Sequence, residues 1–148
     1  MALPWVLISR YGRADFIFAP DPAEQVKDHG QHYDYVRPLA TIEPTAIALG
    51  RPVDTSFGYK DVDKLDSALV SAPYHNAVVF VAWEHFKLVE AARRLVQRLG
   101  GDPKIVPDWP ESDFDSLYVL TFTWTGDRAA ISFAHHQESL NGRSTTCP

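Results

Sequence analysis

The chain has 148 residues, of which 45% are hydrophobic and 22% are charged, and its formal net charge is -5. This length suffices for a single domain, 1–148, with a substantial core, and the composition is that of a globular rather than a disordered protein. The negative charge argues against non-specific nucleic-acid binding, which needs a basic face.

The number of cysteines and the apolar runs indicate the cellular compartment in which the protein is expected. The single cysteine, Cys147, makes a disulfide within the chain impossible. No apolar run reaches the roughly 18 residues that a membrane helix needs. The first residues lack the basic start and the cleavage site of a signal peptide. We therefore expect a cytoplasmic protein with no membrane partner.

The first half of the chain alternates strand and helix signals. Residues 1–12 resemble the last turns of a helix, with Gly12 as its C-cap. Ala14–Ala19 is short, apolar and bounded by turn formers, which predicts a buried strand. Helices are predicted over Pro38–Leu49 and Val62–Val70.

The second half begins with another buried strand, Ala77–Trp83. Apolar residues then repeat at three and four over His85–Leu99, which predicts an amphipathic helix. Ser116–Thr123 and Ala129–Ala134 predict a hairpin, and residues 136–148 a polar tail. This order favours an α/β domain with a mainly parallel sheet and an antiparallel edge.

Arg37 is the first candidate binding residue. It precedes Pro38, which suits the first turn of a helix because its missing N–H would have no partner there. Free N–H groups and a guanidinium in one place favour an anion site. The alternative is a surface arginine paired with a carboxylate.

Glu84 and His85 are the second candidates, because they follow a buried strand and begin a helix. Ligands bind beyond the carboxyl ends of strands in open parallel sheets. A histidine there can donate to an anionic group near neutral pH. The alternative is a histidine that only caps the helix or lies satisfied in the core.

Two further segments carry less chemistry. The acidic and aromatic stretch Asp108–Asp115 predicts a loop that covers the core with Trp109 and Phe114 buried, and a substrate-facing role is the alternative. His135 and His136 are neighbours on a predicted strand and point to opposite faces, so a zinc site is unsupported. Glycine-rich phosphate loops and paired-cysteine motifs are absent, and no cofactor or metal is expected.

Four segments in this order resemble the histidine phosphatase superfamily, which includes phosphoglycerate mutases and acid phosphatases. They are FIFAPDP, YDYVRPLATIEP, FVAWEH and DWPESDFDSLYVL, and they span Phe16 to Leu120. The resemblance implies a phosphoglycerate mutase-like three-layer αβα sandwich and a pocket for phosphate or a phosphorylated small molecule. Arg37 matches the family's second phosphate-binding arginine, and His85 its second histidine, so both would bind phosphoryl oxygens.

The same resemblance exposes a departure. The family's nucleophilic histidine lies in an Arg-His-Gly motif on the first strand, and this sequence contains no such motif. Arg10-Tyr11-Gly12 stands too close to the strand at Phe16 to replace it, and fits a helix end better. The resemblance thus predicts that the first strand is missing or replaced, with residues 1–12 a remnant of the first helix.

Three functions remain open at this point. The chain is expected to be an inactive phosphate-binding member; alternatively, it hydrolyses phosphomonoesters when an upstream start or another chain supplies the strand. The third is a non-enzymatic interaction protein. A missing interior strand leaves an open sheet edge, so we expect a homo-oligomer. Glu84, with Asp61 second, is the candidate proton donor beside the catalytic His85.

Overall fold

The structure, a computed structural model, describes residues 3–140, which fall into two compact units, 3–84 and 85–140. Both contain helices and strands, so the expected mixed α/β class is confirmed. The expectation of one domain stays a prediction. Cys147 and most of the predicted polar tail lie outside the described residues, whereas His136 and Gln137 belong to a strand.

The first unit begins with helix α1 (Leu3–Tyr11). Gly12 ends it with a φ of 81°, a left-handed conformation that glycine adopts without a steric penalty, and its N–H donates to the Ile8 carbonyl at 3.0 Å. α1 packs against helix α2 (Arg37–Leu49), and the Arg13 guanidinium donates to the Leu49 carbonyl at 3.1 Å. Arg10 and Tyr11 therefore lie at a helix end, as predicted.

Strand β1 (Phe16–Phe18) pairs in parallel with β4 (Val79–Val81), as the two apolar runs indicated. The far edge of β1 is also bonded, because the Asp54 N–H donates to the Ile17 carbonyl at 2.8 Å. Ile17 and Phe18 are each only 1% exposed. A strand buried in this way reads as a continuous apolar run rather than an alternating one.

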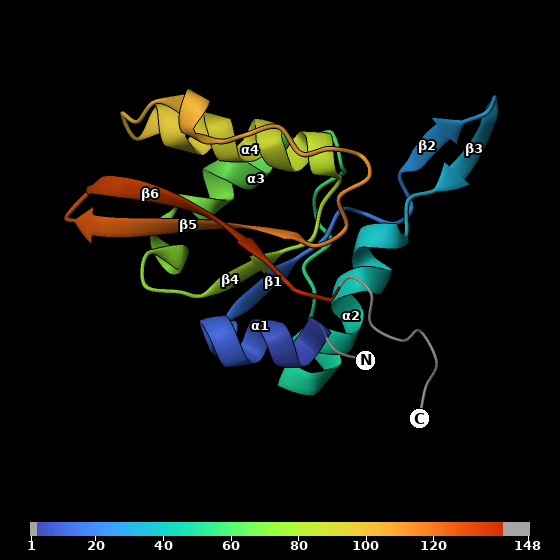
Figure 1. Cartoon of the computed structure of the whole chain (residues 1–148), viewed down its shortest axis with the longest axis horizontal. Helices are drawn as coiled ribbons and strands as arrows, with labels where there is room; N and C mark the ends of the chain where they lie inside the picture. The colour runs from blue at the N-terminus through green and yellow to red at the C-terminus, as the bar shows by residue number, and fades with distance from the viewer. Residues whose placement is uncertain (1–2, 141–148) are drawn as a thin grey trace. The chain divides into compact units, whose positions relative to one another are not determined.

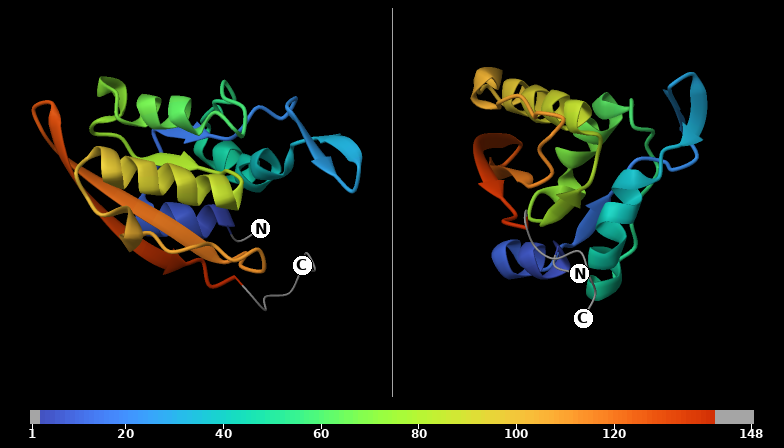
Figure 2. Two further views of the ribbon diagram at one scale, coloured as in Figure 1. Left: turned by 90° about the horizontal axis from the view of Figure 1, so that it is seen from above. Right: turned by 45° about the vertical axis from the view of Figure 1, so that its right-hand side comes forward.

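Two antiparallel strands that the sequence did not predict, β2 (Gln25–Asp28) and β3 (Gln31–Asp34), follow β1. Almost all of their residues are exposed, so no apolar pattern marked them. Figures 1 and 2 show this blue-to-cyan hairpin standing out from β1 and α2. Its last residues lead directly into α2.

Helix α2 has Pro38 in its first turn and Gly50 as a left-handed C-cap with a φ of 62°. The unit is completed by α3 (Val62–Leu69) and a short 3-10 turn, Ala72–Tyr74. Both predicted helices are thus confirmed to within one residue at each end.

The second unit, 85–140, comprises helix α4 (His85–Arg98), a 3-10 turn at Pro103–Ile105, and the hairpin β5 (Ser116–Thr125) and β6 (Arg128–Gln137). The hairpin is antiparallel over ten pairs, and Figure 2 shows its orange-red ribbon running along α4. The apolar face of α4 and one face of the hairpin form the core of this unit: Val89, Ala92, Val96, Val106, Trp109, Tyr118, Leu120, Ile131 and Phe133.

The described strands form one parallel pair and two antiparallel pairs. No helix in the described range is long and apolar enough to cross a bilayer.

Candidate functional site

The first candidate site is a group of side chains in the unit 3–84 that we call the Tyr35 cluster: Tyr35, Arg37, Tyr59, Trp83 and Glu84. Tyr35 directly follows β3, and Arg37 begins α2. Trp83 and Glu84 follow β4, and Tyr59 lies in the loop before α3. The cluster therefore joins the carboxyl end of a parallel strand to a helix N-terminus.

Contacts within the cluster are specific. The Tyr35 and Tyr59 ring centroids are 5.3 Å apart, and the Arg37 guanidinium carbon lies 5.9 Å from the Tyr35 centroid. The Trp83 indole N–H donates to the Tyr59 carbonyl at 2.8 Å. Tyr35 is 7% exposed, whereas Arg37 is exposed. A buried tyrosine, packed on the half-buried Tyr59, thus supports a guanidinium that faces solvent.

Electrostatics link Glu84 to the same place. Burial raises the pKa of Tyr35, the Glu84 carboxylate raises it further, and the Arg37 guanidinium opposes both. The Tyr35 phenol is accordingly neutral over the physiological range. Two of the three predicted site residues, Arg37 and Glu84, thus both act electrostatically on Tyr35.

His85 belongs to the other unit, where it is the first residue of α4. It is half-buried, and its ring centroid lies 4.1 Å from that of Phe86. Its approach to Arg37 stays a prediction.

The pKa of Asp61, the weaker candidate acid, is shifted in the direction opposite to the one that a general acid requires. A hydrogen bond with the Lys64 ammonium and one from the Gly58 N–H hold the Asp61 pKa below its usual value. A general acid at neutral pH needs a raised pKa. Asp61 therefore does not fit the role.

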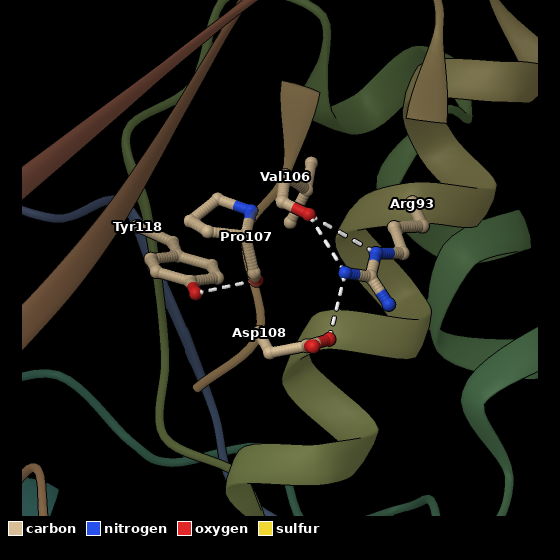
Figure 3. Close-up of polar contacts among 5 residues, drawn as sticks. All are labelled: Arg93, Val106, Pro107, Asp108 and Tyr118. Carbon is tan, nitrogen blue, oxygen red and sulfur yellow. Dashed lines mark hydrogen bonds and ion pairs between the residues drawn. The ribbon is translucent and has the colours of Figure 1, made fainter. Parts of the chain in front are cut away.

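The unit 85–140 contains a groove of about 570 Å³ between α4 and the segment 108–111, lined by Phe86, Val89, Glu90, Arg93, Arg94, Gln97, Asp108, Trp109, Pro110 and Glu111. The Arg93 guanidinium donates twice to the Val106 carbonyl, at 3.1 and 2.9 Å, and once to Asp108, at 2.9 Å (Figure 3). The Tyr118 hydroxyl donates to the Pro107 carbonyl at 2.8 Å. These hydrogen bonds connect the loop at residues 106–108 to helix α4 and to strand β5.

The prediction for this loop is half correct. Trp109 packs on the core, its ring 4.7 Å from that of Tyr118, but Phe114 is 80% exposed and the expectation that it is buried is wrong. Asp113 and Asp115 flank Phe114, and both carboxylates accept backbone N–H bonds. Because these bonds hold the backbone there, the side chain between them points to solvent.

A polar relay of Asp113, Ser116 and His135 lies at the base of the hairpin. The Ser116 hydroxyl donates to Asp113, and the His135 Nε2 lies 2.6 Å from the same hydroxyl oxygen. A carboxylate only accepts, so Nε2–H is the donor to Ser116. Ser116 is 4% exposed, and the relay joins the start of β5 to the end of β6.

Sequence reasoning missed Tyr35, Tyr59 and the Ser116 relay. Tyr35 stands two residues before Arg37, so the aromatic neighbour was visible, but its pairing with Tyr59 depends on a loop 24 residues away. Among the described residues, no three His, Cys, Asp or Glu side chains gather as metal ligands would.

No family model matches the chain, and neither the curated proteins nor the solved structures compared with it give a match. The resemblance to histidine phosphatases therefore rests on the four sequence segments.

Proposed function

We propose that the chain binds phosphate, free or carried by a small molecule, at the Tyr35 cluster, as a member of the histidine phosphatase type that does not hydrolyse esters by itself. One observation carries the proposal. An exposed arginine occupies the first position of a helix whose N-terminus has no side-chain cap, and its guanidinium lies over the ring of the buried Tyr35.

The physical case rests on unsatisfied donors. The N-cap, Val36, has no side-chain oxygen to accept from the first N–H groups of α2, and Pro38 has no N–H of its own. The helix dipole favours an anion at this end. The guanidinium of Arg37 adds a planar fork of donors that matches phosphate oxygens.

Hydrolysis needs a nucleophile that this sequence does not supply. It has no Arg-His-Gly motif, and Tyr11 of the nearest match ends α1 rather than a strand. Our proposal gives His85 the second phosphate contact and Glu84 the position of proton donor, within a phosphoglycerate mutase-like sandwich. Binding and turnover are thereby separable.

The test is calorimetric titration of the full chain with inorganic phosphate. Arg37→Ala removes charge-assisted bonds of about 1.5–3 kcal/mol, so affinity should fall about 10- to 150-fold. Arg51→Ala removes the same charge just beyond the other end of α2 and should leave affinity unchanged. Equal losses in both variants, or no binding by the wild type, would sink the proposal.

One observation supports a second candidate function, an interaction through a sheet edge. Within the described residues, β4 pairs with β1 alone, so its other edge has no strand partner. Unpaired strand edges recruit strands from other chains. A homo-oligomer of this kind would show by light scattering as a mass above 16.6 kDa, and a strict monomer would exclude it.

A further inference from the structure

The guanidinium of Arg37 lies over the ring of Tyr35, with 5.9 Å from its carbon to the ring centroid. A cation at this distance is attracted by the negative face of the ring. Without such a contact, an exposed arginine at a helix start samples many rotamers, and binding a ligand would freeze them at a cost.

Tyr35 itself is held in place. Its N–H donates to the Glu24 carbonyl at 3.1 Å, which closes the base of the β2–β3 hairpin. The Tyr59 ring packs 5.3 Å away, and the Tyr59 carbonyl accepts the Trp83 indole N–H. The Tyr35 ring thus packs on the loop before α3, and that loop is itself bonded to the segment after β4.

From these contacts we infer that Tyr35 is a positioning residue, whose ring holds the Arg37 guanidinium at the N-terminus of α2 ready for an anion. The inference rests on the proposed function and assigns to the ring a role in phosphate affinity. The hydroxyl is separate: its electrostatic neighbours are Glu84, Arg37 and Tyr59, and it stays protonated. The positioning effect therefore belongs to the aromatic face and not to the phenol oxygen.

Two variants separate the ring from the hydroxyl. Tyr35→Phe keeps the ring and should bind inorganic phosphate as the wild type does. Tyr35→Met fills similar space without a ring, and should weaken phosphate binding about threefold, the value expected for an exposed cation–π contact. Tyr33→Met is the matched control, because Tyr33 is an exposed strand residue whose hydroxyl bonds to Gln31.

Nuclear magnetic resonance reads the position of Arg37 directly. Ring currents of Tyr35 should move the Arg37 side-chain protons upfield in the wild type and in Tyr35→Phe, but not in Tyr35→Met. This measurement needs no phosphate. The wild-type spectrum alone tests the contact, so the test does not depend on whether a variant folds.

The outcomes are distinct. Unshifted Arg37 protons in the wild type, or a loss in Tyr35→Phe equal to that in Tyr35→Met, would overturn the inference. If phosphate binding depends on Arg37 but is the same in Tyr35→Met as in the wild type, the inference fails and the proposed function stands. If the wild type binds no phosphate, the proposed function fails, and the role of Tyr35 in phosphate affinity fails with it.

Discussion

The hydrogen bonds of Arg93 provide a sharp test of what holds the unit 85–140 together. Its guanidinium is the only described donor to the carbonyl of Val106, a residue that is 0% exposed, and it also pairs with Asp108 (Figure 3). Arg93→Met keeps most of the apolar stem and removes all three bonds. The variant therefore isolates the loss of the donors from the loss of packing.

The bonds of Arg93 to Val106 and to Asp108 are expected to contribute very different free energies to stability. A hydrogen bond that involves a charged group contributes about 1.5–3 kcal/mol, and a buried carbonyl left without a donor costs a similar amount. The Asp108 side chain is 90% exposed, and an ion pair so exposed contributes close to zero. We expect Arg93→Met to destabilise the unit by about 2 kcal/mol, and Asp108→Ala by no more than about 0.5 kcal/mol.

Native-state hydrogen exchange is the suitable assay, because it reports the opening free energy of α4, β5 and β6 separately from the rest of the chain. The amides of these elements should exchange faster in Arg93→Met by the predicted amount and almost unchanged in Asp108→Ala. If Asp108→Ala lowers the opening free energy as much as Arg93→Met does, the surface ion pair contributes to stability and the argument from the buried carbonyl is refuted.

Three further predictions follow from the structure. The Ser116 hydroxyl is the main cause of the lowered Asp113 pKa, with N–H groups of Asp115 and Ser116 and the charge of His135 adding to it. Because the folded pKa of Asp113 lies below the unfolded one, the ionised carboxylate stabilises the fold. This stabilisation is present above the ordinary pKa of 3.8 and is lost as pH falls through the folded pKa. Ser116→Ala should therefore lower the melting temperature at pH 7, and the gap from the wild type should narrow towards pH 3; a constant gap would contradict this. Gly101→Ala places a Cβ 2.8 Å from the Val96 Cγ1, and should lower the free energy of unfolding in urea by about 1–3 kcal/mol. An unchanged urea midpoint would contradict this prediction. The full chain should hydrolyse p-nitrophenyl phosphate no faster than buffer, and rapid turnover abolished by His85→Ala would show that a nucleophile is present after all.

Much of the secondary structure was predictable because it is encoded locally. Helix α4 shows apolar residues at intervals of three and four, and Gly100 follows its end. β1 and β4 are short apolar runs between turn formers. The β2–β3 hairpin was missed because most of its residues are polar and exposed, so neither alternation nor an apolar run distinguishes it from a loop.

The site was predictable only in part. Arg37 was identified because Pro38 marks a helix start, and Glu84 because a buried strand ends just before it. Their common neighbour Tyr35 depends on how the segments after β3 and β4 converge. Phe114 was expected inside because it is aromatic, yet backbone bonds to its two acidic neighbours decide its exposure.

By itself, then, the sequence determined the helices and the apolar strands, because caps, turn residues and apolar periodicity act over a few residues. It also determined that Arg10-Tyr11-Gly12 closes a helix, since Gly12 supplies the left-handed cap. Only the tertiary structure decided that Tyr35 supports Arg37 and that Ser116 links Asp113 to His135. Tyr35 and Arg37, like Asp113 and Ser116, are close in sequence, but Tyr59 and His135, which complete the two groups, come from distant segments, and no local preference specifies their approach.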